Sequence, residues 1–164
     1  MKILYLHGLD SFLQDDRRVV LQTFGTVLAP ILDYKNTPNL FQKLQNEFTD
    51  VQAIIGSSVG GLATYYLAQA LNKPCLLFNP ALNFRDQLPI NTAFNPSYSG
   101  YMRLVIGLRD EVIPAWEVVD IVKNDILENQ NIDIQLISRM KHSYPISIFQ
   151  EEVSIFFTKL ASLS

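Results

Sequence analysis

The chain has 164 residues, of which 48% are hydrophobic and 18% are charged, and its formal net charge is −3. This length and composition are typical of one compact domain, so we expect a single domain over residues 1–164. The 13 basic residues form no stripe with interleaved aromatic residues, which argues against nucleic-acid binding. No apolar run approaches the roughly 18 residues that a membrane span requires.

The chain contains one cysteine, Cys75, and two histidines. One cysteine excludes an intramolecular disulfide and is typical of a reducing compartment. The apolar run at the N-terminus is too short for a signal peptide, so we expect a cytoplasmic protein. We expect Cys75, in the run CLLF, to be a buried thiol. The cysteine and histidines are too few for a zinc site, which leaves only carboxylate-based metal sites open.

Apolar runs alternate with helical patterns along the whole chain. In chain order, we expect a strand at 2–7, a helix at 15–24, a weak edge strand at 26–32, a helix from Thr37-Pro38 to about Phe48, a strand at 51–55, a helix at 60–71 and a strand at 75–78. A polar loop or short lid follows at 83–100, then a strand at 101–107, a helix at 115–129, a strand at 132–137 and a last helix at 146–160. Strands without period-two alternation are buried on both faces, so the pattern predicts an α/β fold with an open, mostly parallel sheet and helices on both faces.

The stretch IIGSSVGG, residues 54–61, contains the pattern Gly-x-Ser-x-Gly in one register only. In that register Gly56 and Gly60 flank Ser58, whereas a motif centred on Ser57 would need a glycine where Ile55 stands. The turn follows a predicted strand and precedes a predicted helix, which is the setting of a nucleophile elbow. A phosphate-binding or purely structural turn is the alternative for this motif alone.

A reactive serine needs a base, and the base needs a group that orients it. His142 follows the last predicted strand, and Asp110 follows the strand at 101–107 in the segment GLRDEVIP. Glu111 is the alternative acid. His7 ends the first strand, and we expect it to fix a loop rather than act as the base. The order Ser58, Asp110, His142 is the chain order of α/β-hydrolases, and the carboxyl ends of parallel strands meet at one edge.

Two backbone amides are the expected oxyanion hole. Val59 N–H begins the helix after Ser58, and Leu9 N–H lies in the loop that Gly8 allows to turn closely.

The segments LYLHGLDS, IIGSSVGG, LLFNPAL, GLRDEVIP and KHSY together resemble the small bacterial α/β-hydrolases of the YqiA/YcfP-like esterase family. The resemblance covers nearly the whole chain. It implies an α/β-hydrolase fold with a minimal lid and no cap domain, and serine esterase activity on small acyl groups. Ser58, Asp110 and His142 match the family's nucleophile, acid and base, and Asn79-Pro80-Ala81 matches a family signature that we expect to shape the pocket floor.

The resulting hypothesis is a serine hydrolase that cleaves a small-molecule ester or thioester through an acyl-enzyme, with no cofactor. A non-catalytic binding protein of the same fold, an acyltransferase and a lipase are the alternatives. The expected edge strand near 26–32 is exposed and free to pair with a second copy, so the sequence allows either a monomer or a homodimer. Several aromatic residues lie where they would meet substrate, although lid packing explains them equally well: Phe12, Phe84, Phe94, Tyr98 and Trp116.

Overall fold

The computed structural model describes residues 1–89, 95–126 and 130–163. Six parallel strands form one sheet in the order β2-β1-β3-β4-β5-β6. The strands are β1 (Lys2–Leu6), β2 (Thr26–Leu28), β3 (Ala53–Ser57), β4 (Cys75–Phe78), β5 (Met102–Gly107) and β6 (Ile132–Ile137). The parallel sheet that the buried apolar runs predict is therefore confirmed.

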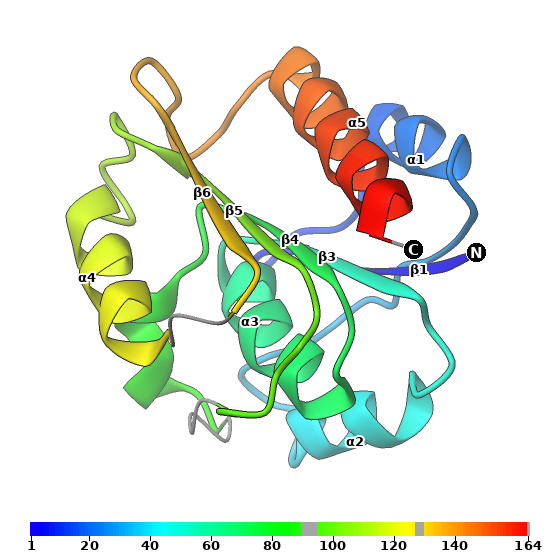
Figure 1. Ribbon diagram of the computed structural model, residues 1–164. Coiled ribbons are helices and arrows are strands. Elements are labelled where there is room, and N and C mark those ends of the chain that lie inside the picture. Colours follow the sequence, from blue (N-terminus) through cyan, green and yellow to red (C-terminus); the bar gives the residue numbers. More distant parts are fainter. Residues whose placement is uncertain (90–94, 127–129, 164) are drawn as a thin grey trace.

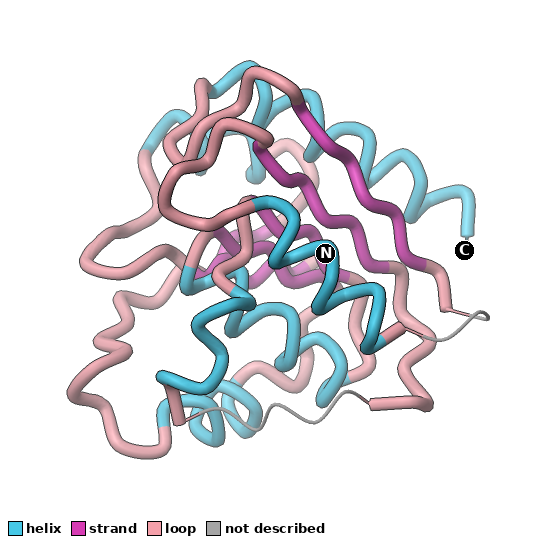
Figure 2. The backbone as a smooth tube through the Cα atoms, turned by 90° about the vertical axis from the view of Figure 1, so that its left-hand side faces the viewer, coloured by secondary structure: helices cyan, strands magenta, loops and turns pink. Residues whose placement is uncertain are grey.

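Helices cover both faces of the sheet (Figure 1). They are α1 (Asp15–Gln22), α2 (Leu40–Glu47), α3 (Val59–Leu71), α4 (Ala115–Asp125) and α5 (Ile146–Leu163), with a short 3₁₀ helix, η1 (Leu82–Gln87). Helices α1 and α5 lie on one face, and α2, α3 and α4 lie on the other. Figure 2 shows the same layers after a quarter turn.

Each face of the sheet has its own hydrophobic core. Leu4 and Leu6 of β1 pack toward the α3 side, whereas Ile3 and Tyr5 of the same strand pack toward α5. This division follows from the alternation of side chains along a strand. All four residues are at most 3% exposed, so β1 is buried on both faces, as its unbroken apolar run predicts.

Several element boundaries differ from the predictions. Strand β2 ends at Leu28, before Pro30, and is an edge strand. Helix α2 begins at Leu40 rather than at Thr37-Pro38, because Asn39 adopts a left-handed conformation with φ 55°. Strand β3 lies two residues later than expected and includes Ser57, so α3 begins directly after Ser58.

The remaining differences concern loops. The 3₁₀ helix η1, residues 82–87, overlaps the start of the lid expected at 83–100, and residues 90–94 of that lid, including Phe94, lie outside the described residues. Helix α4 ends at Asp125, and residues 127–129 of the helix expected at 115–129 lie outside the described residues. In the part of the chain that the structure describes, no helix is both long and apolar enough to cross a bilayer.

Candidate active site

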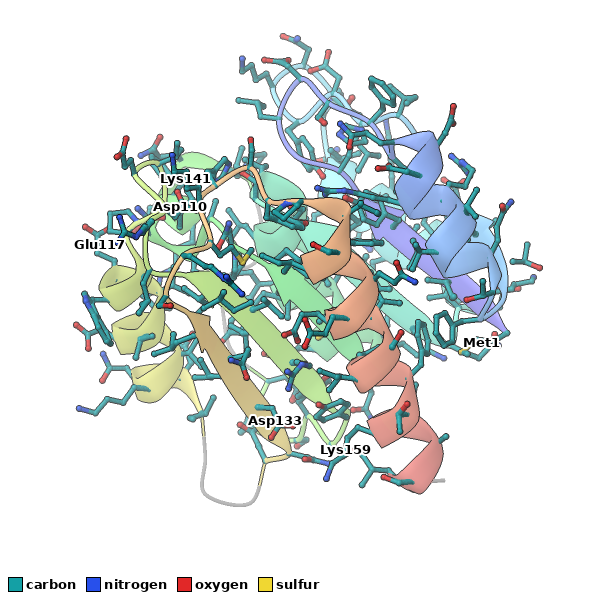
Figure 3. The ribbon with its side chains drawn as sticks, turned by 90° about the horizontal axis from the view of Figure 1, so that it is seen from above. Met1, Asp110, Glu117, Asp133, Lys141 and Lys159 are labelled. Carbon is teal, nitrogen blue, oxygen red and sulfur yellow. The ribbon has the colours of Figure 1, made fainter. Side chains whose placement is uncertain are left out.

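The loops that follow β1, β3 and β6 enclose a cavity of about 780 Å³ at the carboxyl edge of the sheet. Ser58, His142 and Leu9 all contribute to its lining. Figure 3 shows Asp110 and Lys141 near one another at this edge, with Asp133 and Lys159 at the opposite end of the molecule. The structure thus brings sequence-distant candidates to one place, as the parallel topology predicts.

Ser58 lies on a strained turn between β3 and α3. Its backbone has φ 56° and ψ −120°, a region that residues with a Cβ rarely adopt. Hydrogen bonds hold the turn in place: Ser58 N–H donates to Phe78 O, and Ser58 O accepts from the amides of Leu62 and Ala81, each at 3.0 Å. Such strain is characteristic of a nucleophile elbow, and it persists because the surrounding bonds determine the backbone.

The two glycines of the motif are required by close packing. A Cβ on Gly56 would lie 2.2 Å from Thr64 Oγ1, and a Cβ on Gly60 would lie 2.0 Å from Leu6 O. Both distances are shorter than any tolerable contact, so these positions accept only glycine. Gly8 lies on the other side of the serine, where a Cβ would be 3.9 Å from Ser58 Oγ. The flanking glycines therefore let α3 and the β1 loop approach the turn.

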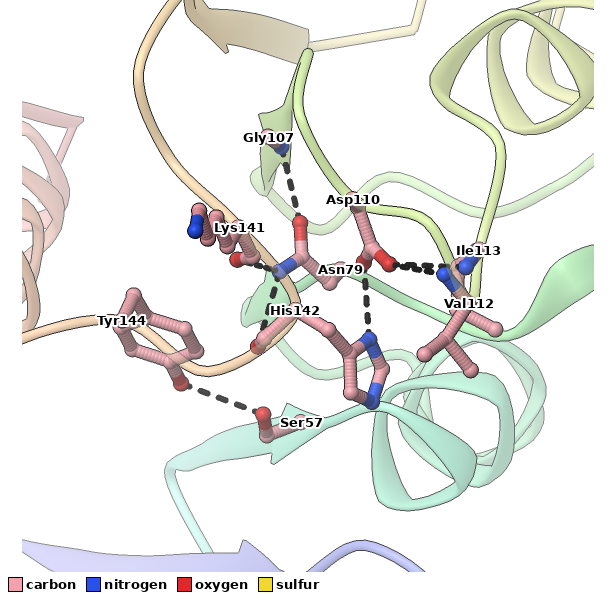
Figure 4. Close-up of polar contacts among 9 residues, drawn as sticks. All are labelled: Ser57, Asn79, Gly107, Asp110, Val112, Ile113, Lys141, His142 and Tyr144. Atoms are coloured by element: carbon pink, nitrogen blue, oxygen red, sulfur yellow. Dashed lines mark hydrogen bonds and ion pairs between the residues drawn. The ribbon is translucent and has the colours of Figure 1, made fainter.

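Asp110 and His142, in the loops after β5 and β6, are joined by a hydrogen bond (Figure 4). His142 Nδ1 lies 2.8 Å from Asp110 Oδ2, and because a carboxylate only accepts, Nδ1 carries the hydrogen. Asp110 Oδ1 accepts from the amides of Val112 and Ile113, both at 2.8 Å. The Asp110 side chain is fully buried and that of His142 is 28% exposed, so the ring alone reaches the cavity. Glu111, the alternative acid, is exposed.

Asn79 connects three strand ends behind this pair. Its Oδ1 accepts from Gly107 N–H at 2.8 Å, and its Nδ2 donates to Lys141 O at 2.9 Å and His142 O at 3.2 Å (Figure 4). Asn79 is 1% exposed and has φ 40°, a conformation that asparagine tolerates better than most residues. Its side chain fixes the backbone of the His142 loop. The sequence placed Asn79 in a signature but gave no indication of these contacts.

Leu9 and Val59, whose amides are the expected oxyanion hole, both line the cavity. For neither amide does the structure record a hydrogen bond to a described residue. His7 holds the Leu9 loop: its Nε2 accepts from Leu32 N–H at 2.8 Å, and its Nδ1 lies 2.6 Å from Gly8 O. His7 is 2% exposed, so the expectation that it fixes a loop agrees with its contacts.

Tyr144, to which the sequence gives no role, is the side-chain partner of Ser57. Ser57 Oγ lies 3.1 Å from the hydroxyl of Tyr144 (Figure 4). The Tyr144 ring stacks on Phe78 with the ring centroids 5.0 Å apart. Burial raises the pKa of the Tyr144 phenol, and the charge of Arg17 opposes that shift only in part. The proximity of Tyr144 to His142 in the segment KHSY was the only sequence signal for its position.

Of the aromatic residues that could meet substrate, two line the cavity and two lie elsewhere. Phe12 and Phe84 line the cavity. Tyr98 instead donates to Lys73 O at 2.9 Å, and Trp116 is 63% exposed and does not line the cavity. Across residues 1–89, 95–126 and 130–163, no three His, Cys, Asp or Glu side chains come together as ligands for a metal ion.

Comparisons with known proteins identify the family and the fold of the chain. A family model described as "Uncharacterised protein family (UPF0227)" matches residues 2–97. No curated protein sequence matches the chain.

Three solved structures have the same fold. Est1E from Butyrivibrio proteoclasticus with bound ferulic acid is 16% identical with a TM-score of 0.73, over 98% of this chain and 89% of that one. MGS-MChE2, an alpha/beta hydrolase enzyme from a sediment metagenome of the Mar Chica lagoon, Morocco, is 18% identical with a TM-score of 0.72, over 99% and 91%. Mouse alpha/beta hydrolase domain-containing protein 10 is 17% identical with a TM-score of 0.67, over 99% and 90%. The predicted α/β-hydrolase fold is confirmed.

Proposed function

Because the chain belongs to the UPF0227 family of YqiA-like proteins and has the α/β-hydrolase fold, we propose that it is a serine hydrolase that cleaves small carboxylic esters or thioesters. The family membership agrees with the resemblance drawn from the sequence. The observation that carries the proposal is the 2.8 Å contact between His142 and Asp110 at a cavity that the strained Ser58 also lines.

Ser58 Oγ attacks the acyl carbon of the bound ester while His142 Nε2 accepts the hydroxyl proton. Asp110 keeps the hydrogen of the neutral ring on Nδ1, so that Nε2 is the accepting nitrogen, and it stabilises the imidazolium that forms. The tetrahedral oxyanion accepts hydrogen bonds from Leu9 N–H and Val59 N–H. The N-terminus of α3 favours the same negative charge.

Collapse of this intermediate breaks the bond to the leaving alcohol or thiol, which takes its proton from His142. Water then attacks the acyl-enzyme, and His142 accepts its proton and returns one to Ser58 Oγ as the acid leaves. The chain's own residues supply every proton transfer, and no step requires a cofactor.

Labelling with a fluorophosphonate probe, followed by peptide mapping, tests the proposal. We expect the wild-type protein to be modified on Ser58 and to hydrolyse p-nitrophenyl acetate and butyrate. Ser58→Ala should lose both properties. Ser57→Ala is the matched control, because it removes a neighbouring hydroxyl and should still be labelled.

Two results would contradict the proposal. Modification of Ser57 instead of Ser58 would show that the nucleophile is assigned to the wrong position. An absence of both labelling and turnover in the wild type would favour a binding protein of the same fold. Product analysis in the presence of an added alcohol distinguishes hydrolysis from acyl transfer.

A further inference from the structure

Arg17 of α1 contributes a guanidinium to the wall of the cavity that Ser58 lines. Its Nη1 donates to the Tyr144 hydroxyl at 3.1 Å, and its Nη2 donates to Tyr144 O at 3.0 Å. Its Cζ lies 4.3 Å from the centre of the Tyr144 ring. Two hydrogen bonds therefore connect the guanidinium to Ser57 Oγ, next to the proposed nucleophile.

The positive charge of Arg17 has no carboxylate partner. No Asp or Glu of the described residues lies within ion-pair distance of its guanidinium, and Arg17 Nε is buried without a hydrogen-bond acceptor. A half-buried cation without a counter-charge is unfavourable, and an unpaired buried donor in a native protein requires an explanation. The nearest acid in the sequence, Asp16, uses its carboxylate to accept the backbone amide of Arg17.

The two phenols that face Arg17 do not neutralise it. Burial raises the pKa of Tyr5 and the pKa of Tyr144, in each case against the influence of Arg17. Both side chains therefore stay protonated and uncharged at neutral pH, and they supply no negative charge to pair with Arg17.

The fixed charges in the lining of the cavity are both positive. Its described lining includes two basic side chains, Arg17 and Lys35, and no aspartate or glutamate. Lys35 already pairs with Asp10 at 3.3 Å, and both of these side chains are mostly exposed. Arg17 is therefore the basic residue of the lining that lacks a carboxylate partner among the described residues.

We propose that Arg17 binds an anionic group of the substrate, a carboxylate or a phosphate, so that the site prefers esters with a negative charge near the scissile bond. The guanidinium suits this role because it presents several N–H donors in a plane that matches both groups. Tyr144 orients it through two hydrogen bonds. The inference rests on the proposed hydrolase function, since it names the substrate class of the same site.

The test compares matched charged and neutral esters by the acid released at constant pH. Monoethyl succinate is paired with ethyl pentanoate for a charge on the acyl side. Acetoxyacetate is paired with propyl acetate for a charge on the alcohol side, and 2-acetoxyethyl phosphate replaces the carboxylate by a phosphate. We expect the wild type to have the higher kcat/KM for a charged member, and the preferred pair identifies the side and the anion.

Arg17→Gln should reduce the ratio of kcat/KM between the charged and neutral esters about 10- to 100-fold, mainly through KM, as is typical for loss of a hydrogen bond to a charged group. Arg17→Lys should retain part of the preference. Arg18→Gln makes the same change of charge one residue away, outside the cavity lining, and should keep the wild-type ratio. A purely structural role of Arg17 would lower both rates together and leave the ratio unchanged, which would overturn the inference.

Direct binding separates this inference from the hydrolase proposal. Calorimetric titration of the Ser58→Ala protein with succinate and with inorganic phosphate needs no turnover. Binding that Arg17→Gln weakens at least tenfold would support the anion site even if no ester is hydrolysed. Hydrolysis of the neutral esters without any preference for charge, and without anion binding, would overturn the inference while the hydrolase proposal stands.

Discussion

Two side chains with nucleophilic atoms lie on neighbouring strands but at opposite strand ends, one at the carboxyl edge of the sheet and one at the amino edge. Ser58 follows β3 at the carboxyl edge, with φ 56° and access to a cavity of about 780 Å³. Cys75 begins β4 at the amino edge, is 0% exposed, and has its Sγ 3.7 Å from the hydroxyl of Tyr98. A thiol is intrinsically the more reactive group. Position in the sheet, more than the identity of the atom, therefore decides which side chain is available for chemistry.

The two edges also differ in what supports the side chain. Behind the carboxyl edge, Asp110 and Asn79 use their side chains to fix the loop that carries His142. Around Cys75 the packing is apolar, and burial raises the pKa of the thiol to about 12. Polar side chains that make several hydrogen bonds to the backbone of a loop stabilise one geometry of that loop, whereas apolar packing only excludes water.

Among the residues that support Ser58 at the carboxyl edge, we expect the largest effect from Asp110→Asn. The asparagine amide would donate to His142 Nδ1, so the ring hydrogen would move to Nε2 and the base could no longer accept the proton of Ser58. We expect kcat for p-nitrophenyl acetate to fall about 10⁴-fold. The asparagine oxygen can still accept from Val112 and Ile113, so the denaturation midpoint should change little.

Glu111→Gln is the control for this variant, since it changes the adjacent acid, which is exposed. It should keep nearly the full rate. If Glu111→Gln were the more damaging substitution, Asp110 would not be the orienting acid, and the support ascribed to the carboxyl edge would have to be reassigned.

Ser58→Gly tests whether backbone strain distinguishes the two edges. Both Ser58→Gly and Ser58→Ala lack the hydroxyl, but only glycine adopts φ 56° without a steric penalty. We expect Ser58→Gly to have the higher free energy of unfolding, by about 1 kcal/mol, in urea denaturation. The strain would then be a cost of stability that the reactive geometry imposes.

Ser57→Gly and Ser57→Ala provide a control, for which we expect the opposite order of the free energies of unfolding. Ser57 ends strand β3 and is not among the residues with positive φ, so glycine should be the less stable variant there. Equal stability of the two Ser58 variants would mean that the turn relaxes, and strain would no longer separate Ser58 from its surroundings.

The sequence was sufficient for the parts of the site that depend on chain order and strand position. Ser58, Asp110 and His142 each follow a predicted strand, and parallel strands place their carboxyl ends on the same side of the sheet. The structure records the contact between Asp110 and His142, and it places Ser58 and His142 in the lining of the same cavity. The hydrogen bond between Asp110 and His142 is the outcome that this reasoning anticipates. Glycine spacing also identified the turn, because Gly56 and Gly60 have no room for a Cβ.

The sequence was insufficient for contacts between distant segments without a local pattern. Arg17 and Tyr144 are 127 residues apart, and no periodicity or motif relates them. Asn79 was visible as part of a motif, but its bonds to Gly107 and to the His142 loop depend on how three strand ends meet. Boundaries were misjudged for a different reason: Asn39 adopts a left-handed conformation, which delays the start of α2.

The smallest expected effect concerns Cys75, which should not react with iodoacetamide in the native protein. The thiolate is the reactive form, and burial raises the pKa of this thiol to about 12, so very little thiolate exists at pH 8. Mass spectrometry should detect no alkylation of the native chain under conditions that fully modify the chain in urea.

The raised pKa of the Cys75 thiol also makes the stability of the fold depend on pH. The folded state holds this proton more tightly than the unfolded state, so its contribution to stability is complete below the thiol's ordinary pKa of 9.0 and is lost as the pH rises toward about 12. Native alkylation at the rate of the unfolded chain would show that the amino edge opens readily, and burial could then no longer explain why the serine, and not the thiol, is the available nucleophile.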